Sequence, residues 1–373
     1  MKILITGADG FIGSNLVARL TTMWPQYIIY AYDRNTSLEV LRSYTKDCDF
    51  VFHFTAVHRT NRIEDFMEVN YFFFKELLGM LQEYGNSCPV LYTSSIQATQ
   101  DSEYAKSKRL AEELLSQNSL KAGNKSIIYR LTNTFGKWAM PSGHSVVATF
   151  CHKIARNENI EIHNLETVMN FYYIDDVIDT FVNLLHTDLS VYDGKINYLD
   201  SSLLYSITLK ELVKKIYSFK DTRENHAIPN IRDDFTKKLY STYLSYLPNT
   251  DFKYPLCSHI DNRGSFTEIF KTKESGQFSI NVVKPGVKKG EHYHNTKCEK
   301  FLVVSGEARI QFRKIGTNEV INYYVSASKL EMVDVPTGYT HNIINEGIYD
   351  CVILIWANEV YDSSNPDTYF CPV

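Results

Sequence analysis

Short apolar runs alternate with longer amphipathic stretches through the first half of the chain, and this pattern predicts a parallel sheet with helices on both faces. The runs that we expect to form its strands are residues 2–6, 27–32, 50–54, 90–94 and 126–130. Residues 101–117 are charged on one side and carry leucines at helical spacing on the other, which predicts an amphipathic helix. The first half is therefore expected to be α/β, a doubly wound Rossmann fold.

The second half has a different pattern. Residues 201–247 look helical and rich in tyrosine, and the sequence Leu247-Pro248-Asn249 then breaks the helical pattern. Beyond it, short β-rich runs separated by glycine and proline predict an antiparallel sandwich or small barrel. The expected strands are residues 278–283, 300–304, 308–312, 320–325 and 351–356. Because 373 residues exceed what one core usually organises, we predict two domains, residues 1–247 and 248–373.

Composition excludes several classes of protein. Hydrophobic residues at 44% and charged residues at 22% are typical of globular chains, not of disordered or fibrous ones. A net charge of -4 provides no strong basic field, so we expect no nucleic-acid partner. We also expect no membrane span, because no apolar run approaches the roughly 20 residues required. The seven scattered cysteines and the absence of a signal peptide predict a cytoplasmic location.

A glycine-rich turn follows the first expected strand. Gly7, Gly10 and Gly13 form a GxxGxxG pattern between that strand and the next helix. In such a turn the first glycine allows the tight bend, the second lets backbone approach a pyrophosphate, and the third lets the helix pack on the strand. The helix that begins at Phe11 and Ile12 directs the positive end of its dipole at the phosphates. We therefore predict that these five residues bind a dinucleotide, with an ordinary tight turn as the alternative.

Two charged residues, Asp33 and Arg34, follow the second expected strand. A carboxylate at this point can hold the ribose hydroxyls of NADH, whereas a guanidinium can hold the ribose phosphate of NADPH. Both signals are present, so these residues leave the cofactor open. We expect NADPH, because biosynthetic reductions usually use it, with NADH as the alternative.

A YxxxK pattern places Tyr104 and Lys108 one helical turn apart, on the same face of the expected amphipathic helix. Lys108 can hold the nicotinamide ribose, and its positive charge favours the tyrosinate. Tyr104 could then exchange a proton with a substrate oxygen. Such a pair arises easily by chance in a chain with 26 tyrosines, but this one follows the predicted strand 90–94 and the run Thr93-Ser94-Ser95.

Together these features resemble the extended short-chain dehydrogenase/reductase family over about residues 1–245. The resemblance implies a serine, tyrosine and lysine catalytic set, in which Ser95 joins Tyr104 and Lys108 and Ser94 is the reserve. Sugar 4,6-dehydratases of this family carry an Asp-Glu pair after their catalytic threonine, whereas Ile96-Gln97 follow Ser95 here. We therefore expect reduction of a keto-sugar, or epimerisation through one, and no dehydration. Further matching pieces are His53-Phe54-Thr55-Ala56, Asn70, Tyr129-Arg130 with Asn133 and Gly136, and Tyr173-Ile174-Asp175-Asp176-Val177.

Three histidines and a glutamate in the second half have the spacing of a metal site. His292 and His294 are two residues apart and so project to one face of a strand, where Glu299 and His341 from neighbouring strands can join them. The spacing resembles the two cupin motifs over about residues 255–365. That resemblance implies these four residues as ligands of a divalent metal, one of which can yield to water. Zinc would suit a Lewis acid acting on a sugar carbonyl, with iron, nickel and manganese as alternatives.

The segment Asp261–Glu268 resembles the DxRGxFxE signature of nucleotide-sugar 3,5-epimerases and keto-isomerases, which are also cupins. The whole chain, including residues 94–100 and 301–306, resembles bifunctional capsular-polysaccharide synthesis enzymes, in which an extended short-chain dehydrogenase/reductase is fused to a C-terminal cupin. This resemblance implies a UDP-sugar substrate and two steps. The cupin inverts carbon 3 of UDP-2-acetamido-2,6-dideoxy-4-hexulose, and the reductase then reduces carbon 4 with NADPH on the route to UDP-N-acetyl-L-fucosamine. The alternative to a bifunctional enzyme is a reductase whose cupin only binds sugar or joins subunits. We also expect a homodimer.

Overall fold

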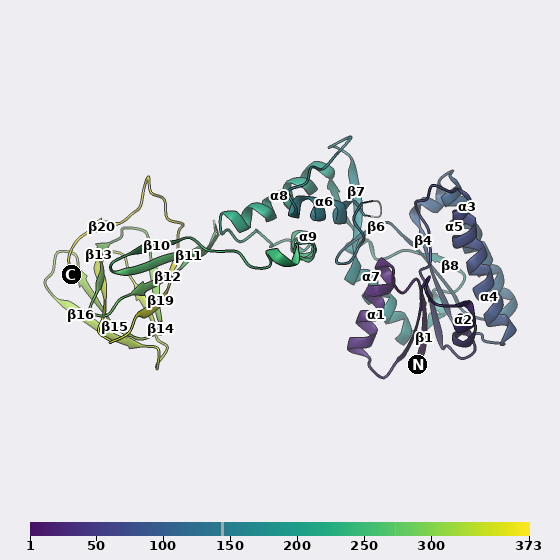
Figure 1. The fold of residues 1–373 in the computed structure, drawn as a ribbon, viewed down its shortest axis with the longest axis horizontal. Helices are drawn as coiled ribbons and strands as arrows, with labels where there is room; N and C mark the ends of the chain where they lie inside the picture. Colours follow the sequence, from purple (N-terminus) through teal and green to yellow (C-terminus); the bar gives the residue numbers. More distant parts are fainter. Residues whose placement is uncertain (143–144, 273) are drawn as a thin grey trace. The chain divides into compact units, whose positions relative to one another are not determined.

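The computed structural model describes residues 1–142, 145–272 and 274–373, and these residues form two compact units (Figure 1). The Rossmann unit comprises Met1–Tyr217 and Ile231–Pro248. The barrel unit comprises Ser218–Asn230 and Asn249–Val373. Residues 218–230 therefore group with the barrel although they precede residue 247, and the two domains expected from the sequence stay a prediction.

A six-stranded parallel sheet, in the order β2-β1-β3-β4-β5-β8, is the centre of the Rossmann unit. Its strands are β1 (Lys2–Thr6), β2 (Ile28–Tyr32), β3 (Phe50–His53), β4 (Val90–Ser95), β5 (Ser126–Leu131) and β8 (Lys195–Asn197). The five strands predicted from apolar runs are confirmed to within one residue at each end. The strand order reverses beside β1, and ligands of open α/β sheets bind at the carboxyl ends of strands at such a point.

Helices cover both faces of this sheet (Figure 1). Side chains of β1 alternate between two cores: Ile3 and Ile5 pack with α1 and α7, whereas Leu4 packs with α4 and α5. This alternation explains why residues 3–5 of β1 are all apolar, since a strand buried on both faces has no polar side. The helices of the Rossmann unit up to residue 183 are α1 (Phe11–Met23), α2 (Leu38–Thr45), α3 (Glu64–Met67), α4 (Phe73–Glu83), α5 (Glu103–Ala122), α6 (Val146–Ala155) and α7 (Ile174–Asn183).

The Rossmann unit also contains a small second sheet, in the order β6-β7-β9. Its strands are β6 (Asn133–Phe135), β7 (Val168–Tyr173) and β9 (Tyr205–Thr208), and the last helices are α8 (Leu209–Glu224) and α9 (Asp234–Ser245). The expectation that residues 201–247 are helical is wrong at β9, which pairs with β7. Short 3₁₀ turns lie at Ile96–Thr99, Leu184–His186, Leu189–Val191, Ser201–Leu203 and Asn249–Asp251, and a π-helical turn at Glu68–Phe72. In the described part of the chain, no helix is long and apolar enough to cross a membrane.

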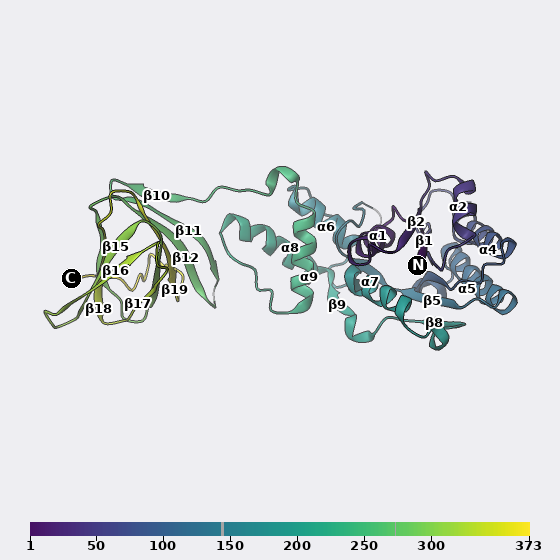
Figure 2. The ribbon, with the colours of Figure 1, turned by 90° about the horizontal axis from the view of Figure 1, so that it is seen from below.

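The barrel unit is built from two antiparallel sheets, whose strands curve around a common interior in Figures 1 and 2. The first, ordered β10-β11-β12-β19-β14-β17, comprises Ser258–Asp261, Gly264–Thr272, Gly276–Val283, Cys351–Ala357, Glu299–Ser305 and Met332–Val335. The second, ordered β16-β15-β18-β13-β20, comprises Val320–Ser326, Glu307–Lys314, Tyr339–Asn345, Lys288–Tyr293 and Tyr369–Phe370. Phe301 and Ile353 from the first sheet pack with Ile310 and Ile343 from the second. The predicted antiparallel β barrel is therefore confirmed.

The segment between α8 and α9 is joined to the edge of this barrel. Ala227 forms a parallel bridge with Lys271 of β11. The backbone N–H of Lys271 donates to the carbonyl of His226 at 2.9 Å, and the N–H of Ile228 donates to the carbonyl of Lys271 at 2.9 Å. These hydrogen bonds explain why residues 218–230 belong to the barrel unit.

Candidate functional site

The glycine turn lies between β1 and α1, at the point where the strand order reverses. Gly7 has a φ of +70°, and a Cβ there would lie 2.9 Å from the backbone nitrogen of Thr55. A Cβ on Gly13 would lie 2.1 Å from the carbonyl oxygen of Gly7. Gly10 precedes Phe11 as the N-cap and makes no side-chain cap, so the first backbone N–H groups of α1 are free to meet phosphate oxygens. The turn therefore fits a dinucleotide pyrophosphate closely.

Asp33 and Arg34 come directly after β2, next to this turn. The Asp33 carboxylate accepts hydrogen bonds from the backbone of Asn35 at 2.8 Å and from the hydroxyl of Thr36 at 3.2 Å. The Arg34 side chain is 80% exposed, and its Nε lies 3.5 Å from Oδ2 of Asp9 in the glycine turn. Such an exposed ion pair is weak, so the guanidinium can turn to another anion at little cost.

Tyr104 lies in the first turn of α5, which begins after the N-cap Ser102. The structure brings it close to Ser95 at the end of β4, and the two side chains interact. Burial raises the pKa of Tyr104, and the interaction with Ser95 offsets this only in part. Burial is the larger of these two effects on the pKa of Tyr104, and the tyrosinate favoured by Lys108 stays a prediction.

Lys108 is buried one turn further along α5. Its Nζ donates to the carbonyl of Thr93 at 2.9 Å and lies 4.7 Å from the ring centre of Tyr92. Burial lowers the pKa of Lys108 to about 7, although the carboxylate of Glu112 opposes the shift. The amino group is thus fixed beside the carboxyl end of β4, the strand that carries Ser95.

The two neighbouring serines have different surroundings. The Ser94 hydroxyl is hydrogen-bonded to the carboxylate of Glu112, which also forms a two-pronged ion pair with Arg130 at 2.9 and 2.7 Å. Ser95 instead meets Tyr104 and accepts a hydrogen bond from the backbone of Gln97 at 3.1 Å. Ser94 is therefore part of a buried structural network, and Ser95 is the serine beside the tyrosine.

Two buried polar residues support this region, and the sequence indicated them only as pieces of the family pattern. Asn70 makes hydrogen bonds of 2.8 and 2.9 Å to both backbone groups of Val57 and one of 3.0 Å to Ser107 on α5. His53 is fully buried, and its Nδ1 lies 2.7 Å from the hydroxyl of Thr6. Burial lowers the pKa of His53 to about 3, so this imidazole is neutral. A polar residue inside an apolar strand was the signal that could have singled out His53.

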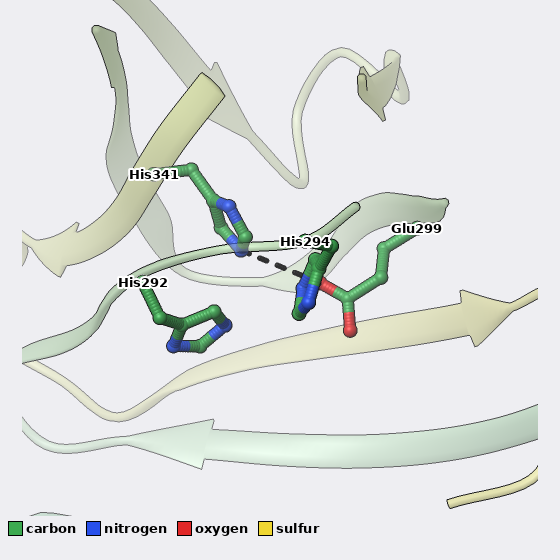
Figure 3. Close-up of side chains that lie close together, drawn as sticks. All are labelled: His292, His294, Glu299 and His341. Atoms are coloured by element: carbon green, nitrogen blue, oxygen red, sulfur yellow. Dashed lines mark ion pairs between the residues drawn. The ribbon is translucent and has the colours of Figure 1, made fainter. Parts of the chain in front are cut away.

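The four predicted metal ligands come together in the barrel (Figure 3). One ligand atom from each of His292, His294, Glu299 and His341 lies within 4.8 Å of the others. Oε2 of Glu299 is 3.5 Å from Nε2 of His294 and 3.4 Å from Nε2 of His341. These separations exceed a strong hydrogen bond, and neither nitrogen has a hydrogen-bond partner among the described residues. Buried nitrogens without partners are uncommon, and a shared cation would satisfy both.

The electrostatics of this cluster also suit a cation. Burial alone would raise the pKa of Glu299, but the adjacent imidazoles of His294 and His341 hold it well below its usual range. Burial lowers the pKa of His292 to about 4, and repulsion by His341 adds to the shift. The carboxylate is therefore ionised and His292 is neutral near pH 7, and these are the forms that bind metal ions.

Two hollows flank the cluster. One, with a volume of about 490 Å³, is lined by Glu299, Lys297, Glu268 and His226, and the other, with a volume of about 350 Å³, by His292. Part of the segment Asp261–Glu268 lines both. His226 was missed by sequence reasoning because it precedes α9, far from the barrel motifs, and no local pattern marks it.

Known proteins match this chain over its full length. Residues 3–197 match the NAD dependent epimerase/dehydratase family, and residues 259–369 match the polysaccharide biosynthesis C-terminal domain. A Pseudomonas aeruginosa protein, UDP-2-acetamido-2,6-beta-L-arabino-hexul-4-ose reductase, is 42% identical over 376 residues, which cover 100% of this chain and 99% of that protein.

Two solved structures of capsular polysaccharide assembling protein CapF agree with these matches. The Staphylococcus aureus structure has 43% identity and a TM-score of 0.91, and 100% of each chain is covered. A CapF structure with the inhibitor 3-isopropenyl-tropolone has 41% identity and a TM-score of 0.88, again with 100% of each chain covered. The resemblance to bifunctional capsular-polysaccharide enzymes is thus confirmed. The chain belongs to the NAD dependent epimerase/dehydratase family, as an enzyme that uses a nicotinamide cofactor and carries a polysaccharide-biosynthesis domain after its Rossmann unit.

Proposed function

We propose that this chain is a bifunctional enzyme of UDP-linked 4-keto sugars. The barrel inverts carbon 3 of UDP-2-acetamido-2,6-dideoxy-4-hexulose, and the Rossmann unit reduces the 4-keto group with NADPH. The product, UDP-N-acetyl-6-deoxy-L-talosamine, leads to UDP-N-acetyl-L-fucosamine for capsule or O-antigen polysaccharide. The Pseudomonas aeruginosa relative is named as a reductase of such a 4-keto sugar. The observation that carries the proposal is the presence in one chain of a serine, tyrosine and lysine site and of a four-ligand centre.

In the reduction, Tyr104 acts as the acid. Bound NADPH supplies the hydride for carbon 4. Tyr104 gives its phenolic proton to the carbonyl oxygen, so that the C=O bond becomes a C–H and an O–H bond, and its raised pKa keeps that proton available. Ser95 donates a hydrogen bond to the same oxygen, and Lys108 holds the nicotinamide ribose. We assign the adenosine ribose phosphate of NADPH to the exposed guanidinium of Arg34.

In the epimerisation, His292, His294, Glu299 and His341 hold a divalent cation, for which zinc fits the donor set best. Such a cation supplies a Lewis acid that stabilises negative charge on a sugar oxygen. The 4-keto group acidifies the hydrogen at carbon 3, which leaves as a proton, and a proton returns on the opposite face. Inhibition of CapF by a tropolone supports a metal, because tropolones chelate divalent ions through two adjacent oxygens.

The reductase assignment is tested with Tyr104→Phe. This variant should lose NADPH oxidation on the 4-keto sugar, because the phenolic proton is missing, while hydrogen at carbon 3 still exchanges with solvent deuterium. Undiminished NADPH oxidation would refute the role of Tyr104. Comparing NADPH with NADH as reductant in the wild-type enzyme tests the choice of cofactor.

The epimerase assignment is tested with Glu299→Ala. Loss of one anionic ligand should abolish zinc retention, measured by elemental analysis, and deuterium entry at carbon 3, measured by NMR in heavy water. The variant should still reduce a substrate supplied with carbon 3 already inverted. If the wild-type enzyme introduces no deuterium, the barrel only binds sugar or joins subunits. We further propose a homodimer in the cytoplasm, which sedimentation equilibrium of the purified enzyme can test for subunit number.

A further inference from the structure

Asp367 contacts the loop that joins two of the metal-ligating residues. It lies in the C-terminal tail between β19 and β20, whereas the loop connects His294 with Glu299. Its carboxylate accepts hydrogen bonds from the backbone nitrogens of Asn295 at 3.0 Å, Thr296 at 2.8 Å and Lys297 at 2.8 Å. The hydroxyl of Thr296 adds a further bond of 3.0 Å. A single buried carboxylate therefore organises three successive residues of the loop.

The backbone of Asp367 acts on His294 itself. Its carbonyl oxygen lies 2.6 Å from Nδ1 of His294. Because a carbonyl only accepts hydrogen bonds, Nδ1 must carry the proton of a neutral imidazole. Nε2 then has a free lone pair, and it is the nitrogen that lies 3.5 Å from Oε2 of Glu299. This is the tautomer that a metal-ligating histidine needs, and carbonyl partners commonly fix it.

Several contacts hold Asp367 in place. Its φ of +37° falls in the left-handed region, which residues other than glycine adopt at a cost. The ammonium of Lys297 donates to the carbonyl of Pro366 at 3.2 Å and to the hydroxyl of Thr368 at 2.8 Å. Beyond this point, β20 pairs with β13, the strand that carries His292. The tail is therefore bound on both sides of Asp367.

We propose that Asp367 is a positioning residue of the metal centre: its carboxylate holds the loop between His294 and Glu299, and this anchorage keeps its own backbone carbonyl against Nδ1 of His294, which sets the tautomer of that ligand. It does not belong to the ligand cluster, because its carboxylate is already satisfied by the loop. The inference rests on the proposed function for the reaction that the metal serves. Its test measures metal binding, so the two ideas can fail separately.

The test compares Asp367→Asn with Asp362→Asn in the full-length enzyme. Asp362 lies in the same tail, where its exposed carboxylate contacts Ser364 away from the ligand cluster. Zinc affinity is measured by competition with a chromogenic chelator, and ligand geometry by the visible spectrum of the cobalt-substituted enzyme. We expect Asp367→Asn to weaken zinc binding by about 10- to 100-fold, as for other residues that support a ligand, and to alter the cobalt spectrum. Asp362→Asn should leave both unchanged.

Wild-type zinc affinity and an unchanged cobalt spectrum in Asp367→Asn would overturn the proposal, whatever happens to epimerisation. If that variant fails to fold, Thr296→Val provides a second test because it removes only the hydrogen bond from the Thr296 hydroxyl. It should weaken zinc binding by about 2- to 10-fold, the usual effect of one hydrogen bond. Unchanged affinity in Thr296→Val would then count against Asp367. If wild-type enzyme binds zinc yet introduces no deuterium at carbon 3, the proposed epimerisation fails while the role of Asp367 stands.

Discussion

Adding one methyl group at Gly13 should separate α1 from the turn that it follows. An ideal Cβ at this position would lie 2.1 Å from the carbonyl oxygen of Gly7 and 2.8 Å from Cα of Ala8. Both blocking atoms belong to the backbone, so no rotamer change relieves the overlap. The start of the helix must move back by about 1 Å, and overpacking of this kind costs about 1–3 kcal/mol of the free energy of unfolding.

The same movement carries the N-terminus of α1, at Gly10 and Phe11, away from the cofactor pyrophosphate. We expect Gly13→Ala to weaken NADPH binding at least about 10-fold, which corresponds to about 1.4 kcal/mol. Gly79→Ala is the matched control, because Gly79 lies inside α4 and its Cβ would meet no atom within 4 Å. An alanine there should raise the free energy of unfolding by about 0.5–1 kcal/mol.

Two measurements decide the outcome. Fluorescence titration gives the dissociation constant for NADPH, and urea unfolding of the Rossmann unit gives the stability of each variant. Opposite signs of the stability change at Gly13 and Gly79 would support the close approach of helix and turn. Wild-type NADPH affinity and stability in Gly13→Ala would refute the reasoning, and an equal loss in both variants would assign the effect to glycine replacement in general.

Three further predictions concern the buried polar groups and the metal. His53 has a folded pKa of about 3, below the unfolded 6.5, so its contribution to stability is full above pH 6.5 and is lost as the pH falls towards 3. Between pH 8 and pH 5 the free energy of unfolding should fall by about 2 kcal/mol because of His53. His53→Asn should abolish this pH dependence in urea-unfolding measurements. Asn70→Ala leaves both backbone groups of Val57 unpaired and should lower the free energy of unfolding by about 2–4 kcal/mol in the same assay. A change below about 0.5 kcal/mol, the effect of a surface substitution, would contradict the role of Asn70. Removing metal with a chelator should stop deuterium entry at carbon 3 but leave NADPH oxidation on pre-inverted substrate, and zinc should restore the exchange.

The sequence predicted the central strands well for a physical reason. Each of the five predicted strands of the Rossmann sheet contains a run of apolar residues, because helices cover both faces of the sheet. Residues 205–208 were expected to be helical, and they form β9 because β7 provides a pairing partner that no local pattern reveals. Strands β6 and β8 are only three residues long, too short for an alternating pattern to predict.

Residues of the candidate sites could be predicted where a short spacing in the sequence determines the direction in which side chains point. The positions of His292 and His294, two apart in sequence, indicated a shared direction, and the structure brings both into one cluster with Glu299. Asp367 follows His294 by 73 residues and bonds to it through a backbone carbonyl, which carries no sequence signature. The choice between Ser94 and Ser95 likewise depended on Glu112, whose ion pair with Arg130 forms only in the folded chain.

The bridge between Ala227 and Lys271 bears on how the protein can be dissected. If the chain were divided at residue 248, the C-terminal fragment would be a barrel without its edge segment, residues 218–230, which borders Glu268. The N-terminal fragment would keep this segment without the barrel strand to which it bonds. Exchanging the C-terminal halves of two relatives at residue 248 would place the segment 218–230 of one protein against the barrel of the other. Chimaeras should therefore transfer residues 218–230 along with the barrel, as a discontinuous module.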